Sequence, residues 1–410
     1  MHFSFDLHAL RRIGLGSDPH QAWLQWQASA PGAPGAVGAL GAPGAVGAVG
    51  ALGAEPFLAR IVEVQRERYL LHNGQQGHPA VASGALMRTL DARADALAVG
   101  DWVAAGQTPA SDADCPWQVL DCLPRRSEIA RRSNDGYHQS RRQVLVANVD
   151  TALLVMGLDH DFNPRRLERY LALARLAGVA SVLVLTKADT VDDTVRQRRI
   201  SQAREVLPAD VDLLALDARQ PGVNLWLAPW LSLGQTLVLL GSSGAGKSTL
   251  TASLIADEGA QTPVPVSGSV RADDSRGRHT TTARTLYLNP AGACIIDTPG
   301  LRALRLDAED GAALGAAFED VARLASQCRF RNCQHNDEPG CAVRAAVDHG
   351  RLRNFQKLLR EVQKDGLSAV QRQTQARLQQ QALVSMWRTR SRASRANRLA
   401  RGKAQAGADQ

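Results

Sequence analysis

The feature that most constrains the fold is the run GSSGAGKS at residues 241–248. It matches the pattern G-x-x-x-x-G-K-[ST] and stands between the apolar run TLVLL and the helical run STLTASLIAD. Glycines let backbone N–H groups turn inward around phosphates, the lysine reaches the outer phosphates and the final hydroxyl ligates Mg²⁺. A chance glycine-rich turn is the alternative. We predict a phosphate-binding loop made of Gly241, Ser242, Ser243, Gly244, Ala245, Gly246, Lys247, Ser248 and Thr249.

The segments before this loop follow a strand and helix pattern. Residues 143–158 and 180–189 are almost continuous aliphatic, β-branched runs, and residues 162–178 between them carry apolar side chains at helical spacing. Strand, helix and strand in this order predict a parallel sheet that is buried on both faces. Further strands are predicted at residues 211–217, 236–243, 284–290 and 292–300.

A four-residue segment at the end of one predicted strand indicates which base is bound. Guanine-selective proteins with such a phosphate loop carry N/T-K-x-D, whose aspartate accepts hydrogen bonds from guanine. Alone, four such residues are equally well explained by an ordinary strand-to-helix turn. Beside the phosphate loop they predict guanine binding by Thr186, Lys187, Ala188 and Asp189.

A third element, DTPG at residues 297–300, follows the apolar run ACII. Asp297 is placed to hold the Mg²⁺ shell and Gly300 to sense the γ-phosphate. The polar segment at residues 271–282 is typical of a switch that offers Thr281 to the metal, although an ordinary solvated loop is the alternative. We therefore expect Lys247, Ser248 and Asp297 to act in phosphoryl transfer.

The residue after this element is Leu301, where a glutamine would be able to orient water. We therefore expect slow intrinsic hydrolysis. His279 in the switch segment is a candidate for orienting water, with an ordinary loop histidine as the alternative.

The order of these elements is unusual. The TKAD segment precedes the phosphate loop by about fifty residues, whereas the common GTPase order places it after the D-x-x-G element. The same sheet forms from a permuted chain because the sites lie at strand ends whatever the connection order. The sequence thus predicts a circularly permuted domain, whose switch after Asp297 leads directly into the C-terminal region.

Residues 56–127 show a different pattern. Short alternating runs, FLARIVEV, RYLLHN, PAVASGALM, GDWVAAG and WQVLDCL, are separated by turns at Asn73-Gly74 and Gly100-Asp101. Short strands at this spacing predict a small β-barrel, with the OB-fold as the leading candidate.

The C-terminal region carries a cluster of metal-ligand residues. Three thiols and one imidazole within fourteen residues suit tetrahedral Zn²⁺ with no open position, which predicts a structural metal. The predicted ligands are Cys328, Cys333, His335 and Cys341. Cys115, Cys122 and Cys294 are expected to be ordinary buried residues. Six cysteines are too few for a disulfide scaffold in a chain of 410 residues, and the N-terminal residues lack an apolar signal core, so we expect a cytoplasmic protein.

Two segments lie outside these domains. Glycine recurs at every third position from Gly32 to Gly53, but with too little proline for collagen, so we expect a flexible extension. The net charge of +8 is concentrated in two segments: residues 125–142 with six arginines, and residues 386–410 with six arginines and one lysine. Both are expected to contact nucleic-acid phosphates; a solvated solubility tail is the alternative for the second.

Taken together, these motifs resemble the circularly permuted family called ribosome small subunit-dependent GTPase A. The resemblance spans residues 57–383. It rests on GDWV at 100–103, Arg125-Arg126, ANVD at 147–150, TKAD at 186–189, residues 241–249, GRHTTT at 277–282, DTPG at 297–300 and the Cys-Cys-His-Cys spacing. Two positions depart from the family pattern: Thr186 stands where asparagine is frequent, and Leu216-Asp217-Ala218 occupies the usual S-A base contact.

The resemblance implies a multidomain α/β protein. Its implied parts are an OB-fold at residues 56–127, a permuted GTPase domain at 128–303 and a helical zinc domain at 304–385. Outside the shared pattern we expect a disordered extension at residues 1–55 and a basic tail at 386–410. The implied function is GTP hydrolysis during late maturation of the 30S subunit, stimulated by that particle. The implied cofactors are GTP or GDP, Mg²⁺ and one structural Zn²⁺.

The expected partners are the 30S subunit and its 16S rRNA, with other assembly factors as further candidates, no membrane, and a monomeric chain. Two other functions stay open. The protein is alternatively an RNA-binding assembly checkpoint in which hydrolysis only times release. A second alternative is a P-loop ATPase, and tight binding of ATP would favour it.

Overall fold

The computed structural model describes residues 6–29, 55–65, 67–107, 115–133, 141–256, 284–298, 314–315 and 317–365. His279, Thr281 and Gly300, which we predict to act in the switch segments, lie outside the described residues. The Gly/Ala-rich run and the basic tail also lie outside them.

Residues 57–122 form the predicted barrel. The strands pair in the order β1-β2-β3-β5-β4, and β4 pairs again with β1, which closes the barrel. Their bounds are β1 Phe57–Gln65, β2 Arg68–His72, β3 Gly77–Ala82, β4 Trp102–Gln107 and β5 Trp117–Cys122. The run PAVASGALM is only half strand, because the Ser83 hydroxyl caps helix α3 (Gly84–Ala92) by accepting from Leu86 N–H.

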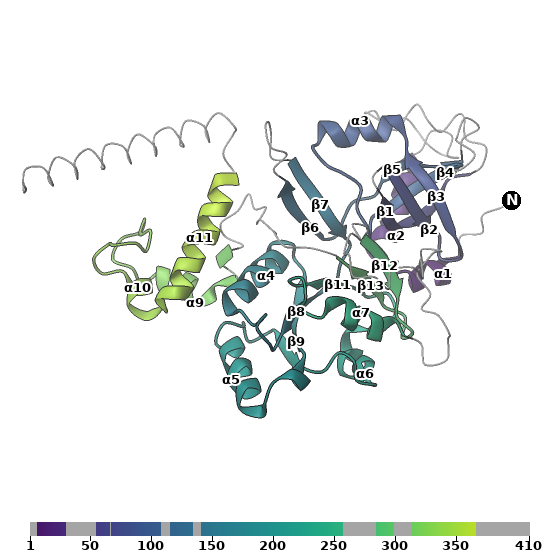
Figure 1. The fold of residues 1–410 in the computed structure, drawn as a ribbon. Coiled ribbons are helices and arrows are strands. Elements are labelled where there is room, and N and C mark those ends of the chain that lie inside the picture. Colours follow the sequence, from purple (N-terminus) through teal and green to yellow (C-terminus); the bar gives the residue numbers. More distant parts are fainter. Residues whose placement is uncertain are drawn as a thin grey trace, which may run out of the picture.

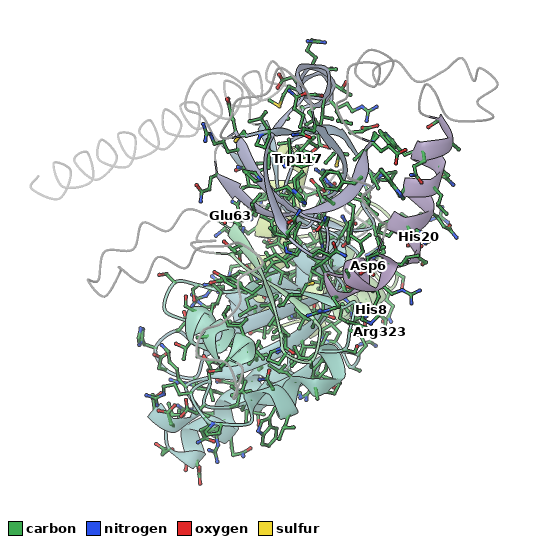
Figure 2. All side chains as sticks on the ribbon, turned by 90° about the vertical axis from the view of Figure 1, so that its right-hand side faces the viewer. Asp6, His8, His20, Glu63, Trp117 and Arg323 are labelled. Atoms are coloured by element: carbon green, nitrogen blue, oxygen red, sulfur yellow. The ribbon has the colours of Figure 1, made fainter. Side chains whose placement is uncertain are left out.

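The expectation of disorder throughout residues 1–55 is wrong for residues 6–29. These residues form α1 (Leu7–Arg12) and α2 (Ser17–Ser29), which lie along the barrel (Figure 2, His8 and His20). Strands β1 and β4 are apolar on both faces, and their outward Leu58 and Trp102 need a cover. Leu10, Ile13 and Trp23 from the two helices supply that cover.

The predicted parallel sheet lies below the barrel in Figure 1. Its strand order is β10-β9-β8-β11-β13, all parallel, and β12 follows antiparallel to β13. Alternate side chains of each strand enter two separate cores, one beneath α4 and α5 and one beneath α6 and α7. The strands are β8 Thr151–Gly157, β9 Ala180–Thr186, β10 Asp212–Ala215, β11 Thr236–Leu240, β12 Arg284–Leu288 and β13 Cys294–Asp297; the helices are α4 Pro164–Leu176, α5 Asp193–Arg204, α6 Val223–Leu227 and α7 Lys247–Ile255.

The apolar run at residues 143–158 is two strands, whereas we expected it to belong to the parallel sheet. Asn148 adopts a positive φ of 55°, a conformation that asparagine tolerates better than most residues. Before it, β7 (Arg141–Ala147) pairs antiparallel with β6 (Glu128–Ser133); after it, β8 enters the parallel sheet. The Asn148 amide donates to Gly100 O (3.0 Å) and accepts from Arg126 N–H (3.0 Å), which holds the break in place.

The barrel and the parallel sheet are joined directly. Strand β12 pairs with β1 through Glu63 and Val64, at the junction labelled by Glu63 in Figure 2. Beside this junction the fully buried Arg60 guanidinium donates to Ile13 O (2.6 Å), Asn148 O (3.1 Å) and Thr236 Oγ1 (3.0 Å). One side chain of the barrel thus fastens α1, the β7–β8 link and the strand that leads to the phosphate loop.

The C-terminal helices lie at the end of the molecule away from the barrel (Figure 1). They are α9 (Glu319–Ala325), α10 (Ala342–Ala346) and α11 (His349–Asp365). Phe318, Leu352 and Leu358 join the same hydrophobic cluster as Leu167 and Leu171 of α4. This region therefore shares a core with the sheet domain.

Candidate nucleotide site and metal centre

The glycine-rich run forms the turn between β11 and α7, as the sequence predicts. Gly244 and Gly246 adopt positive φ values of 83° and 92°, and a Cβ on Gly241 would lie 2.4 Å from Val155 O. Helix α7 begins at Lys247, so its N-terminal N–H groups face the loop. Lys247 Nζ donates to Gly241 O (2.9 Å) and Ser242 O (2.7 Å).

Thr186 joins the base-reading segment to the phosphate loop. Its buried hydroxyl donates to Ala245 O at 2.6 Å, although the two residues are 59 positions apart. A Cβ on Gly246 would lie 3.0 Å from the same hydroxyl, so glycine permits the close approach. Threonine at a position where asparagine is frequent therefore still bonds the loop, and the sheet brings the two predicted segments together.

The remaining base-reading residues lie at the ends of β9 and β10. Lys187 adopts a positive φ of 58°, and its ammonium pairs with Asp159 at 2.8 Å. Asp189 accepts from Arg219 Nη2 (2.6 Å), and Arg219 Nε also pairs with Asp217 Oδ1 (3.2 Å). Hydrogen bonds from the Arg219 backbone and side chain lower the pKa of Asp217. Asp217 thus provides a second carboxylate beside the predicted base reader.

Asp297 stands at the end of β13, next to the β11 strand that leads to the phosphate loop. Its buried Oδ1 has no hydrogen-bond partner among the described residues. Burial raises the pKa of this carboxyl group, and the positive charge of Lys247 opposes that shift. Burial likewise lowers the pKa of Lys247, opposed by Asp297 and Asp161. A buried carboxylate oxygen with free acceptor capacity, close enough to Lys247 to feel its charge, fits a hard cation such as Mg²⁺.

The predicted thiol and imidazole ligands converge in the C-terminal region. Cys328 Sγ lies 3.9 Å from Cys341 Sγ and 3.7 Å from His335 Nδ1, and Cys341 Sγ lies 3.5 Å from that nitrogen. All four ligand atoms, including Cys333 Sγ, lie within 4.8 Å of one another. Tetrahedral Zn²⁺ with ordinary bond lengths needs S–S and S–N separations of about 3.8 and 3.5 Å, so the cluster fits a metal of this kind.

Comparison with known proteins identifies the family. The RsgA GTPase family model matches residues 122–307. The small ribosomal subunit biogenesis GTPase RsgA of Xanthomonas axonopodis pv. citri (strain 306) is 43% identical over 311 residues, which cover 74% of this chain and 80% of that protein. The chain belongs to the RsgA GTPase family. It is therefore a GTP-hydrolysing enzyme.

Solved structures agree with this assignment at the level of the fold. YjeQ from Thermotoga maritima superposes with a TM-score of 0.53 at 21% identity, covering 75% of this chain and 99% of that one. YloQ, described as a circularly permuted GTPase, gives a TM-score of 0.50 at 22% identity, covering 77% of this chain and 97% of that one. The permuted order predicted from the motifs is thereby confirmed.

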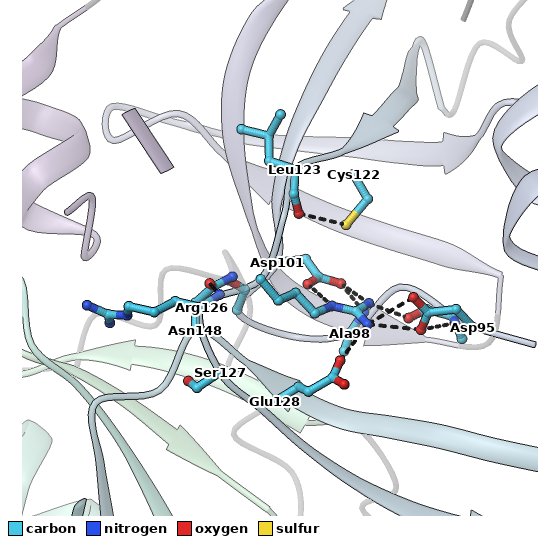
Figure 3. A network of polar contacts seen from close by, with 12 residues as sticks. Asp95, Ala98, Asp101, Cys122, Leu123, Arg126, Ser127, Glu128 and Asn148 are labelled. Atoms are coloured by element: carbon cyan, nitrogen blue, oxygen red, sulfur yellow. Dashed lines mark hydrogen bonds and ion pairs between the residues drawn. The ribbon is translucent and has the colours of Figure 1, made fainter. Parts of the chain in front are cut away.

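Three of the motifs that carry the RsgA resemblance build the joint between the barrel and the next domain. Arg125 pairs with the buried Asp101 (2.7 Å), with Asp95 (2.9 Å) and with Glu128 (3.0 Å) (Figure 3). Burial raises the pKa of Asp101, and hydrogen bonds from Arg125 oppose that shift. Arg126 pairs with Asp150. The first two arginines of the basic segment at 125–142 thus form ion pairs within the protein.

The residues that the sequence reasoning missed are Asp159 and Asp161, in the loop after β8. Asp161 Oδ1 accepts from the Ser242 hydroxyl at 2.5 Å. The sequence could have revealed them only through their position directly after a buried parallel strand. Charged residues at that position lie at the edge of the sheet where ligand sites form. Among the described helices, none has both the length and the apolar character needed to cross a bilayer.

Proposed function

We propose that this protein binds the small ribosomal subunit and hydrolyses GTP during late maturation of that subunit. Binding to the subunit stimulates the GTPase activity. The observation that carries the proposal is the contact between Thr186 and Ala245, because it brings the base-reading segment and the phosphate loop into one site. The 43% identity to proteins named small ribosomal subunit biogenesis GTPase RsgA supports the ribosomal role.

The geometry suggests a role for each phosphate-site residue. Loop N–H groups and the N-terminus of α7 hold the phosphates, and Lys247 exchanges its contacts with Gly241 O and Ser242 O for the outer phosphate oxygens. Ser248 and Asp297 would hold Mg²⁺, which when bound neutralises charge on the phosphate oxygens. Leu301 follows the DTPG element and has no group that orients water, so hydrolysis by the chain alone is slow.

For base selection, we assign the reading of guanine to Asp189. Lys187 is held by Asp159, which fixes the backbone that presents this carboxylate. Arg219 bridges Asp189 and Asp217, so Asp217 can retain Arg219 when guanine takes Asp189. GTP and GDP should therefore displace a fluorescent guanine nucleotide, and ATP should not. Tight ATP binding would favour the ATPase alternative.

The outer parts suit RNA and a structural metal. The barrel strands pair in the closed order β1-β2-β3-β5-β4-β1, and α3 lies between β3 and β4 in the chain. We assign this barrel to the OB-fold class, which binds single-stranded nucleic acid. Cys328, Cys333, His335 and Cys341 would hold one Zn²⁺ with no site for water, which makes the metal structural. We propose 16S rRNA as the nucleic-acid partner of a monomeric, cytoplasmic protein, with the basic tail as one further contact.

The decisive experiment measures GTP hydrolysis with and without purified 30S subunits. We expect strong stimulation by 30S, abolished by Lys247→Ala; equal rates with and without the particle would contradict the proposal. The same variant distinguishes the proposed enzyme from the alternative of an assembly checkpoint in which hydrolysis only times release. A Lys247→Ala protein that loads onto 30S particles and fails to leave favours the checkpoint, and one that never loads weakens it.

A further inference from the structure

The loop between β8 and α4 lies between the two halves of the nucleotide site. Strand β8 pairs with β9, which leads to the TKAD segment, and with β11, which leads to the phosphate loop. The loop folds back sharply: a Cβ on Gly157 would lie 2.5 Å from Asp159 Oδ1, so a larger residue there would push the Asp159 carboxylate out of its place. Asp159 Oδ1 then accepts from Asp161 N–H at 3.1 Å, which fixes the position of Asp161.

Asp161 makes contacts to three different parts of the fold. Its Oδ1 accepts from the Ser242 hydroxyl (2.5 Å) and pairs with Arg166 Nη1 (2.8 Å). Its Oδ2 accepts from Gly157 N–H at 3.1 Å. The carboxylate is almost fully buried, and each of its oxygens is engaged. A hydroxyl-to-carboxylate bond of this length is among the stronger hydrogen bonds in proteins.

We propose that Asp161 is a positioning residue for the phosphate loop and acts through Ser242. This inference rests on the proposed function, because it assigns the loop at 241–248 to nucleotide binding. Ser242 is the second residue of that loop, and its carbonyl oxygen also accepts from Lys247 Nζ. Holding the Ser242 side chain therefore orders the loop before nucleotide arrives, and less conformational entropy is lost on binding.

A carboxylate beside a phosphate site would ordinarily repel the ligand. Here Arg166 pairs with Asp161 through its guanidinium and also donates to Asp161 O (2.6 Å), so the local charge is balanced. The ordering effect and the repulsion predict opposite results when the charge is removed. Ordering predicts weaker nucleotide binding in Asp161→Asn, whereas repulsion predicts tighter binding.

The test is a double-mutant cycle of Asp161→Asn and Ser242→Ala, with Ser242→Thr as the variant that keeps the hydroxyl. We expect each of the first two to weaken GDP binding about tenfold, the double variant to be no worse than either, and Ser242→Thr to bind like the wild type. KM for GTP should rise by the same factor with kcat at saturation unchanged, because the loss falls equally on the ground state and the transition state.

A second measurement does not depend on nucleotide. Hydrogen exchange of the loop amides at 241–246 in the nucleotide-free protein should become about tenfold faster in Asp161→Asn and in Ser242→Ala, and stay unchanged in Ser242→Thr. Asp193→Asn is the matched control, because it removes an exposed carboxylate of α5 whose ion pair, among the described residues, is with Arg196 in the same helix. It should change neither binding nor exchange.

Additive effects in the cycle, tighter binding by Asp161→Asn, or unchanged loop exchange would each overturn the inference. If the wild type binds no guanine nucleotide, the proposed function is wrong, and the exchange measurement still decides whether Asp161 orders the loop. A thermal unfolding curve for each variant shows whether it is folded, and Ser242→Ala alone keeps the test open if Asp161→Asn unfolds.

Discussion

Single side chains make several of the connections that hold the nucleotide site together. The Thr186 hydroxyl fastens the base-reading segment to Ala245 of the phosphate loop, and Lys187 fastens it to Asp159. Both contacts link residues that are far apart in sequence and close at the carboxyl edge of the sheet. Changes of one functional group at such positions should therefore affect nucleotide binding more than stability.

Replacing Thr186 by valine tests this directly, because valine has the same shape and lacks the hydroxyl. The change leaves Ala245 O without its donor in a buried place, and we expect about tenfold weaker GDP binding. Titration with a fluorescent GDP analogue measures it. Thr186→Ser, which retains the hydroxyl, should recover most of the affinity. Wild-type affinity in Thr186→Val would show that the contact is incidental.

His72 in the barrel makes stability depend on pH. Burial, followed by the charge of His78, lowers the pKa of His72 to about 4, and its Nδ1 accepts from Gly74 N–H. In the unfolded chain the pKa is about 6.5, so between these values the unfolded state binds more protons and stability falls as pH drops. The His72→Asn variant keeps a hydrogen-bond acceptor and does not titrate. Between pH 6.5 and 4 we expect its free energy of unfolding to fall by about 1–2 kcal/mol less than that of the wild type. Urea unfolding at several pH values measures the difference; equal losses would contradict it.

At the scale of elements, α4 connects the site to the C-terminal helices. Its first residues follow the Asp161 loop, and its buried Glu168 accepts from Arg351 (2.6 Å) and Asn354 (2.5 Å) of α11. Arg351 also pairs with Asp320 of α9 and lies 4.9 Å from the centre of the Phe318 ring. Helix α4 thus contacts Asp161 through Arg166 at one end and the C-terminal helices through Glu168.

Removing the contacts of Glu168 with Arg351 and Asn354 should destabilise the protein strongly. Glu168→Ala leaves Arg351 partly unpaired in a buried place, and we expect a loss of about 3 kcal/mol in the free energy of unfolding. The matched control is Arg169→Gln, one residue along the helix, which breaks the half-exposed pair with Glu361 and should cost less than about 1 kcal/mol. Similar losses in the two variants, by urea unfolding, would show that the buried cluster has no special role.

Across the whole molecule, three regions are tied into one body. Arg60 fastens the barrel to α1 and to β11, the Arg125 cluster fastens it to β6, and a shared hydrophobic cluster joins α4 to the C-terminal helices. The Cys/His cluster lies at the far end of this body, where Cys341 caps the N-terminus of α10.

Removal of the predicted zinc should therefore act locally first. A chelator should release one metal ion per chain and open residues 319–346 to protease, because the metal would hold together the segment that joins these short helices. GDP binding should persist, since the phosphate loop and the TKAD segment lie on other elements. Cys341→Ser should reproduce the effect without chelator. Protease resistance that a chelator leaves unchanged would contradict a structural metal.

Local patterns in the sequence were enough for the motifs and the main architecture. The phosphate loop, the TKAD segment and the Cys/His spacing each lie within a short stretch, and strand periodicity predicted the barrel and the parallel sheet. The sequence did not reveal α1 and α2 or the break at Asn148. Their formation depends on long-range partners: the outward Leu58 and Trp102 that need a cover, and Gly100 O, which accepts from the Asn148 side chain.

By itself, then, the sequence determined which chemistry the chain carries, because each ligand-binding motif uses neighbouring residues and backbone conformations that short-range rules describe. Only the tertiary structure decided which side chains serve that chemistry from a distance. Asp161 accepts a hydrogen bond from Ser242, 81 positions away, and Thr186 donates one to Ala245 O. Arg125 forms an ion pair with the buried Asp101. The physical reason is that hydrogen bonds and ion pairs depend on distance in space, and strand order in the sheet sets those distances.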